Sequence, residues 1–204
     1  MTDKTIEVFM EELSSGAPVP GGGGASALMG SVAASLCSMV GNLTTGKKKY
    51  AQYQQDIERI MADAKRLVLE SEELIKKDAE VFEPLSKAYS IPKDQEGRDE
   101  ILENALKLAA DAPFEIVVKT REISHLIEEL SVKGSRLAIS DVGVAASACK
   151  AAATGAAMNV YINTKLMKDR EHAQSLNEKT IAIVKEVEER CDKAYKEVFG
   201  GLVV

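Results

Sequence analysis

Two long apolar segments, built almost entirely from small residues, dominate this sequence. The first covers about residues 25–43 and the second about residues 137–167. Both are apolar on nearly all sides at helical spacing, which is typical of helices buried in the middle of a bundle. Small residues recur every four positions in the second segment, at Gly143, Ser147, Ala151 and Gly155. Such a stripe favours close approach of two helix backbones, so we expect two central helices in tight contact.

The remaining segments show the spacing of amphipathic helices. Apolar residues recur every three or four positions across residues 5–13, 50–89, 96–110, 113–130 and 173–199. Pro113 suits the first turn of a helix, so we expect a helix boundary in front of it. No stretch alternates with period two for long enough to form a strand. The sequence therefore predicts an all-α single domain over residues 1–204, made of long and closely packed helices.

Charge and composition exclude several classes of protein. A net charge of −6 and a pI near 5.2 argue against a nucleic-acid partner, because such binding needs a basic surface. The N-terminus carries acids where a secretory signal has bases, and Asp141 and Lys150 would be costly inside a lipid bilayer. Cys37, Cys149 and Cys191 fit buried free thiols better than a metal site. We expect a cytoplasmic protein with no nucleic-acid partner, no membrane partner and no bound metal.

Two glycine patterns look like nucleotide-binding motifs but lack the structural context of those motifs. Residues 22–27 satisfy G-x-G-x-x-A, yet no strand is expected before them and no acidic residue follows at the distance that a ribose requires. Residues 41–48 satisfy G-x-x-x-x-G-K, yet Lys48 stands where a P-loop has Ser or Thr. Neither pattern predicts a nucleotide site.

Residues 14–24 form a shaped loop in front of the first apolar segment. Pro18 and Pro20 have fixed φ angles, and the four glycines at 21–24 permit backbone angles that are closed to other residues. Free N–H groups at the start of a helix favour negative charge or a polarised carbonyl group. The alternative is a tight turn that only lets two helices cross. Four glycines exceed what a turn needs, so a ligand-binding loop is the prediction.

Charged residues mark two further candidate positions. Lys47, Lys48 and Lys49 stand at a helix start, where acids are favoured, so they indicate an anionic ligand unless they only form a solvated turn. Asp141 enters an apolar helix, where a buried carboxylate needs a partner or a raised pKa. Alternatively, Asp141 is an N-terminal helix residue next to a capping Ser140.

Three polar residues are less informative on their own. Asn159 and Asn163 lie one helical turn apart near the end of the second apolar segment, where they could serve a ligand or pair with another helix. Asp78, judged by composition alone, is a surface residue of a charged helix.

These stretches together resemble the family of formiminotetrahydrofolate cyclodeaminases and methenyltetrahydrofolate cyclohydrolases. Residues 18–50, PVPGGGGASALMGSVAASLCSMVGNLTTGKKKY, are close to the most specific motif of the family. DAEVF at 78–82, SDVGVA at 140–145 and NVYIN at 159–163 resemble its weaker second and third regions. Order, spacing and length agree over nearly the whole chain. One departure is Gly134-Ser135, where such proteins tend to have Gly-Asn.

The resemblance implies antiparallel helices in two layers, a homodimer and a crevice that binds tetrahydrofolate one-carbon derivatives. It implies no metal and no redox cofactor. In the cyclohydrolase reaction, water adds to the carbon between N5 and N10 of 5,10-methenyltetrahydrofolate, and the ring opens to 10-formyltetrahydrofolate. In the cyclodeaminase reaction, N10 attacks the N5-formimino carbon and ammonia leaves. We expect the cyclohydrolase, because this chain stands without a formiminotransferase domain.

The resemblance also suggests a role for each candidate residue. Asp141 and Lys48, or its neighbour Lys49, would share proton transfer. The glycine loop would orient the pterin or donate hydrogen bonds to the developing oxygen, Asp78 would bind the amino-pyrimidine edge, and residues near Lys47 would bind the glutamate tail. The residues expected to bind substrate are Pro20, Gly21, Gly22, Gly23, Ser26, Lys47, Tyr50, Asp78, Ser140 and Asn163.

Two other functions stay open on the sequence alone. A cyclodeaminase needs the same placement of the substrate and the same proton transfer, so no residue separates it from a cyclohydrolase. A non-catalytic helical scaffold or folate-binding protein would need neither Asp141 nor the three lysines. Lysines and glycines in so short a span are poor choices for such a scaffold.

Overall fold

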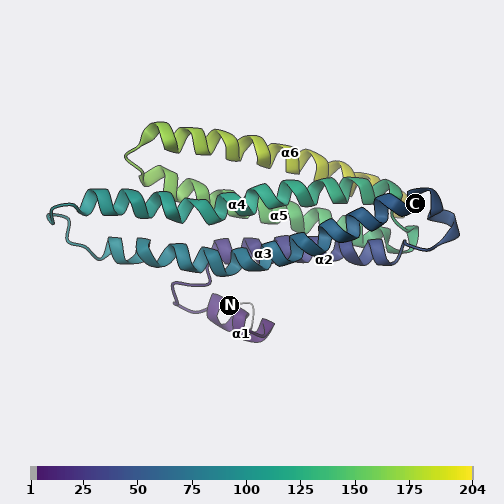
Figure 1. The fold of residues 1–204 in the computed structure, drawn as a ribbon, viewed down its shortest axis with the longest axis horizontal. Helices are drawn as coiled ribbons and strands as arrows, with labels where there is room; N and C mark the ends of the chain where they lie inside the picture. Colours follow the sequence, from purple (N-terminus) through teal and green to yellow (C-terminus); the bar gives the residue numbers. More distant parts are fainter. Residues whose placement is uncertain (1–3, 204) are drawn as a thin grey trace.

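The computed structural model describes residues 4–203, which form helices joined by short turns (Figure 1). The elements in chain order are α1 (Ile6–Leu13), α2 (Gly22–Asn42), the 3₁₀ turn η1 (Lys48–Tyr53), α3 (Gln54–Tyr89), α4 (Arg98–Lys133), the 3₁₀ turn η2 (Arg136–Ala138), α5 (Ile139–Leu166) and α6 (Arg170–Leu202). The described range contains no strand. The predicted all-α single domain is confirmed.

The five long helices pack in two layers. α3, α4 and α6 form one layer, and α2 and α5 form the other, which lies behind the first in Figure 1. Between the layers, α2 contacts α3, while α5 contacts α4 and α6. Successive long helices run in opposite directions, so every turn lies at one end of the bundle or the other. The short helix α1 lies against the side of this bundle and buries Phe9.

Small residues in α5 explain its close contact with α2. A Cβ atom on Gly155 would lie 2.7 Å from the Ser26 hydroxyl oxygen, so only glycine fits at this crossing. Gly143 faces α6 instead, and Ser147 and Ala151 are exposed. The predicted single stripe is therefore wrong in detail. Each four-residue step overshoots a full helical turn by about 40°, so the two ends of the stripe face different neighbours.

α4 runs without a break from Arg98 to Lys133, so the boundary expected in front of Pro113 is wrong. A proline inside a helix lacks the N–H group that would bond to the carbonyl four residues earlier, here Ala109. The side chain of Asn163 donates a hydrogen bond to that carbonyl from α5, at 3.1 Å. A tertiary hydrogen bond thus replaces the missing helical one, and the helix continues.

The buried apolar side chains form two clusters. The larger cluster lies between all five long helices and includes Ile60, Ile127 and Val187. The smaller cluster lies towards the turn between α3 and α4 and includes Leu85 and Leu106. Along α3, α4 and α5, the pocket described below lies between the two clusters, and Ala109 of the smaller cluster is part of its lining.

The three cysteines are free and buried, as expected. They come from α2, α5 and α6 and belong to the larger apolar cluster. Burial raises the pKa of the Cys37 thiol to about 12. The thiolate is the reactive form of cysteine, so Cys37 is chemically inert at neutral pH.

Two segments of the bundle are long and apolar enough to span a membrane on length and composition alone. They are Gly22–Asn42 and Arg136–Leu166, and 56% and 50% of their most apolar windows are buried within the bundle. Core helices of globular proteins pass the same test. Both segments contact each other and the outer layer, which accounts for their apolar character by packing.

Candidate active site

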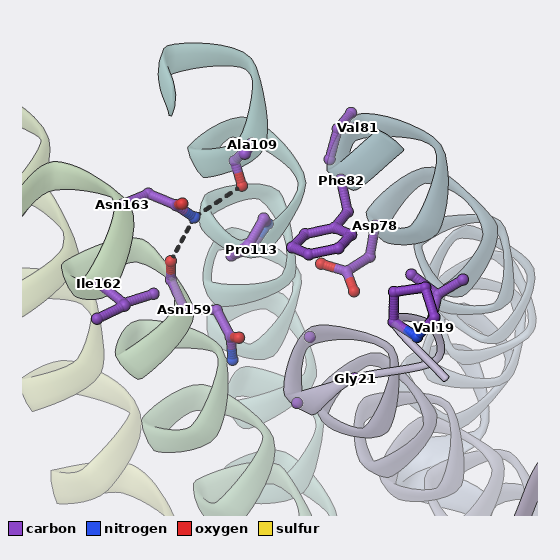
Figure 2. A pocket seen from close by; sticks show the side chains of 13 residues that line it. Val19, Gly21, Asp78, Val81, Phe82, Ala109, Pro113, Asn159, Ile162 and Asn163 are labelled. Carbon is purple, nitrogen blue, oxygen red and sulfur yellow. Dashed lines mark hydrogen bonds between the residues drawn. The ribbon is translucent and has the colours of Figure 1, made fainter. Parts of the chain in front are cut away.

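A pocket of about 250 Å³ opens where α2 begins, between α2, α3, α4 and α5 (Figure 2). Its polar lining comes from Asp78 on α3 and from Asn159 and Asn163 on α5. Phe82 and Pro113 provide apolar walls, and the glycine loop closes one side. Pockets for whole drug-sized ligands are about 300–1,000 Å³, so this one suits a single ring system rather than a complete folate.

Asp78 is the charged group of the pocket. Burial raises the pKa of its carboxyl group, and the nearby backbone N–H of Gly24 lowers it in part. A Cβ atom on Gly23 would lie only 2.1 Å from the Asp78 Oδ1 atom. The carboxylate therefore sits directly on the first turn of α2, where the helix dipole favours negative charge. This contact explains why residue 23 must be glycine.

A second polar side chain lies against the same turn from the opposite helix. A Cβ atom on Gly22 would lie 3.2 Å from Asn159 Nδ2 and 3.4 Å from Asn159 Oδ1. Gly22 and Gly23 are the first residues of α2, so their N–H groups have no acceptor within the helix. The helix therefore begins at Gly22 and not near residue 25 as expected, and its first turn presents free donors beside an amide and a carboxylate.

Two residues expected at this site do not line the pocket. Pro20 is buried behind the loop, with its Cβ atom 3.5 Å from the position of a Cβ on Gly24. The Ser26 hydroxyl donates to the Gly22 carbonyl oxygen at 2.7 Å and packs against Gly155. Both support the loop from behind.

The other expected residues lie at the far end of α2. Lys47 Nζ donates to Ser135 Oγ at 3.4 Å, and the Tyr50 hydroxyl accepts the Arg136 N–H at 2.9 Å. Asp141 is half-buried in the first turn of α5, which begins directly after the 3₁₀ turn η2 that contains Arg136. α2 has 21 residues, so about 30 Å separates this end from the pocket at 1.5 Å per residue. One chain does not bring the two groups together.

The remaining expected site residues at this end are exposed to solvent. Lys48 and Lys49 are exposed, and the Lys49 ammonium lies 5.7 Å from the centre of the Tyr50 ring. Ser140 lines a groove between α5 and α6. The N-cap of α5 is Ala138, so Ser140 does not cap this helix.

The Gly134-Ser135 turn, where the sequence departs from the family pattern, fixes this end of the bundle. A Cβ atom on Gly134 would lie 2.5 Å from the Leu130 carbonyl oxygen, so the glycine is required. The Ser135 N–H donates to Thr44 Oγ1 at 2.8 Å. The turn thereby joins the end of α2 to the start of α5.

A two-layer helical bundle with a small polar pocket at the start of a buried helix defines an all-α protein whose pocket suits a compact polar ligand. The pattern of the formiminotransferase-cyclodeaminase family matches residues 5–182. The chain belongs to this family, and the resemblance seen in its motifs is confirmed.

Individual relatives agree with this assignment. A methenyltetrahydrofolate cyclohydrolase of Methylorubrum extorquens is 40% identical over 176 residues, which is 84% of this chain and 85% of that protein. The formimidoyltransferase-cyclodeaminase of Rattus norvegicus is 28% identical, and the match spans 83% of this chain but only 32% of that protein. The crystal structure of a formiminotetrahydrofolate cyclodeaminase from Thermotoga maritima superimposes with a TM-score of 0.85 at 31% identity, covering 97% and 98% of the two chains.

Asp78 is the residue that composition failed to mark. Its own neighbourhood, LIKKDAEVF, looks like a solvated helix face. The sequence feature that indicated a contact at this place was the pair of glycines at 22 and 23. Consecutive glycines inside a helix indicate that atoms of another element lie against the backbone, but they do not say which atoms.

Proposed function

We propose that this protein is a methenyltetrahydrofolate cyclohydrolase, which hydrolyses 5,10-methenyltetrahydrofolate to 10-formyltetrahydrofolate. The relative that is 40% identical and matched over 85% of its length carries this name. Within the structure, the proposal rests on one observation. The pocket sets the Asp78 carboxylate beside free N–H groups of α2.

This arrangement suits one edge of a pterin. The 2-amino-4-oxopyrimidine ring carries two N–H donors next to a carbonyl acceptor. Asp78 would accept both N–H groups, and the N–H groups of Gly22 and Gly23 would donate to the carbonyl oxygen. The pocket volume suits the bicyclic ring, and the benzoyl-glutamate part would extend outside it.

The reaction needs little beyond placement and proton transfer. The methenyl carbon is part of an amidinium ion and already electrophilic, so we propose that no metal or redox cofactor takes part. A base accepts a proton from the attacking water, and an acid protonates N5 as the N5–carbon bond breaks. Asp141 and Lys48 or Lys49 remain our candidates for these roles, yet they lie at the far end of α2 from the pocket in the same chain.

A homodimer would resolve this separation. α2 has no charged residue, and its exposed side includes Val32 and Met39. The neighbouring side of α5 exposes Val144, Met158 and Ile162. The pocket and the lysine end lie at opposite ends of this apolar face. In a two-fold dimer formed through the face, with the two copies of α2 antiparallel, each pocket would meet the lysine end of the second copy.

We propose a cytoplasmic location, because free buried thiols suit a reducing compartment. The match to a solved formiminotetrahydrofolate cyclodeaminase favours one second candidate, release of ammonia from the 5-formimino derivative. Both reactions would use the same pocket, so only an assay separates them.

The decisive assay follows the absorbance of 5,10-methenyltetrahydrofolate with purified protein. Enzyme-dependent loss of this absorbance, faster than spontaneous hydrolysis, is the expected result. A parallel reaction starts from 5-formiminotetrahydrofolate and measures ammonia. Ammonia release without hydrolysis would show that the protein is a cyclodeaminase instead. No activity in either reaction would support a non-catalytic folate-binding protein.

A further inference from the structure

The amide of Asn163 is held in one orientation by two helices. The side chain is 9% exposed, and its Nδ2 atom donates to the carbonyl oxygens of Ala109 at 3.1 Å and Asn159 at 2.8 Å (Figure 2). Both partners are acceptors only. A flipped amide would place its oxygen against two carbonyl oxygens, so the assignment of nitrogen and oxygen is fixed by chemistry.

The proline in α4 makes this arrangement possible. Ala109 would normally accept the N–H of residue 113, but Pro113 has none, so the carbonyl is free for Asn163. Ala109, Pro113 and Asn163 all line the pocket. The helix gives up one internal hydrogen bond at the site where a polar side chain from α5 must be oriented.

The consequence is an acceptor with no protein partner at the pocket wall. Within residues 4–203, no donor bonds to Asn163 Oδ1, and no buried polar side-chain atom lacks a partner, so this oxygen keeps accessible surface in a residue that lines the pocket. Asn159 repeats the pattern, since its Nδ2 atom donates to the Gly155 carbonyl oxygen at 3.0 Å. Its Oδ1 atom likewise has no donor in the described part of the chain and lies beside Gly22.

The pocket therefore has an uneven distribution of hydrogen-bonding groups. Acceptors come from α3 and α5, as the carboxylate of Asp78 and the amide oxygens of Asn159 and Asn163. Donors come from the start of α2, at Gly22 and Gly23. A complementary ligand needs several N–H groups towards the acceptors and an oxygen towards the helix start.

We propose that Asn159 and Asn163 determine specificity by selecting a ring with an amino group at position 2, as in a pterin, over a ring with oxygen there, as in a lumazine. The choice of this bicyclic ring rests on the proposed function, whereas the fixed acceptors do not. An oxygen at position 2 would face amide and carboxylate oxygens without a hydrogen between them. Such a ligand loses bonds and leaves acceptors unpaired, which sites of this kind discriminate against strongly.

The test compares the dissociation constants of pterin and lumazine, measured by calorimetry with the full chain. The wild-type protein should bind pterin more tightly by about tenfold or more. Asn163→Leu should reduce this ratio several-fold. Asn159→Ala gives a second reading, because its side chain bonds only to its own helix and the variant should fold if Asn163→Leu does not. Asn177→Leu is the matched control, because Asn177 also contacts α5, through Thr164, but lies outside the pocket lining.

A merely structural role for the two asparagines would weaken both ligands by the same factor and leave the ratio unchanged. That result, or a wild-type protein without preference, would overturn the proposal. The hydrolysis assay is independent of this ratio. A clear preference for pterin without turnover would contradict the proposed function alone, and turnover without preference would contradict only the specificity role.

Discussion

Gly23 is restricted to glycine by a neighbouring helix rather than by its own backbone. Positive φ angles among the described glycines occur only at Gly46 and Gly97. At Gly23 the constraint is the Asp78 carboxylate, 2.1 Å from the position of a Cβ atom. We expect Gly23→Ala to displace this carboxylate and to cost about 1–3 kcal/mol of unfolding free energy by overpacking. Urea unfolding and pterin binding would both report the change.

Gly21 provides the control within the same loop. A Cβ atom there meets nothing within 4 Å. Gly21→Ala should therefore change the unfolding free energy by less than about 1 kcal/mol, even though Gly21 is the N-cap of α2. Equal losses in the two variants would mean that loop flexibility, and not the contact with Asp78, explains the glycines.

Asp78 also gives a pH dependence whose sign follows from its burial. Its pKa is raised above the unfolded value of 3.8, so the folded state holds this proton more tightly. The contribution of Asp78 to the unfolding free energy therefore decreases as pH rises through the raised pKa, and it is absent above that pKa. Asp78→Asn has no such titration. Its stability relative to the wild type should rise with pH from about 4 and then level off, and urea unfolding across this range measures the difference.

The helices themselves were predictable because their information is local. The 3.6-residue periodicity of residues 50–89 and 173–199 reappears in α3 and α6, whose bounds differ from the expectation by only a few residues. Pro113 was misread for a tertiary reason. Its helix continues because Asn163, fifty positions later, satisfies the Ala109 carbonyl, and no local pattern contains that information.

A substitution in α4 should change stability and ligand binding in different directions. Pro113→Ala restores the N–H that completes α4, so the unfolding free energy should stay level or rise by up to about 3 kcal/mol. Ala109 would then have a partner within its own helix, and Asn163 would lose part of its anchor. Pterin affinity should fall several-fold while thermal unfolding does not. A parallel loss of both properties would contradict this account.

At the scale of the whole molecule, the candidate site was only half predictable. The glycine loop and Asn163 do line one pocket, but Lys47, Tyr50 and Asp141 lie about 30 Å away at the other end of α2. Sequence spacing could not reveal this, because residues 18–50 form one uninterrupted motif. Because α2 lies inside that motif, the residues at the two ends of the motif are far apart in space.

The apolar face of α2 and α5 provides a test of the proposed homodimer. Met158 is 61% exposed on this face. We expect Met158→Glu to shift the protein from dimer to monomer in analytical ultracentrifugation and to abolish most activity. Leu69→Glu is the control, because Leu69 is 55% exposed on α3, away from the face. A Met158→Glu protein that remains dimeric would place the interface elsewhere.

Mixed dimers test whether each active site takes residues from two copies. Asp141→Asn should lower turnover by about a hundredfold or more if Asp141 transfers a proton, and Asp78→Asn should also be nearly inactive.

In a dimer of one Asp78→Asn chain and one Asp141→Asn chain, one site carries both changes and the other carries neither. Coexpressed variants should then recover about a quarter of wild-type activity, because half of the random dimers are mixed and each holds one intact site. Coexpression of Asp78→Asn with the double variant should recover nothing. Failure of the first pair to recover activity would contradict an active site shared between two copies. Normal turnover of Asp141→Asn by itself would mean that Asp141 has no part in the reaction.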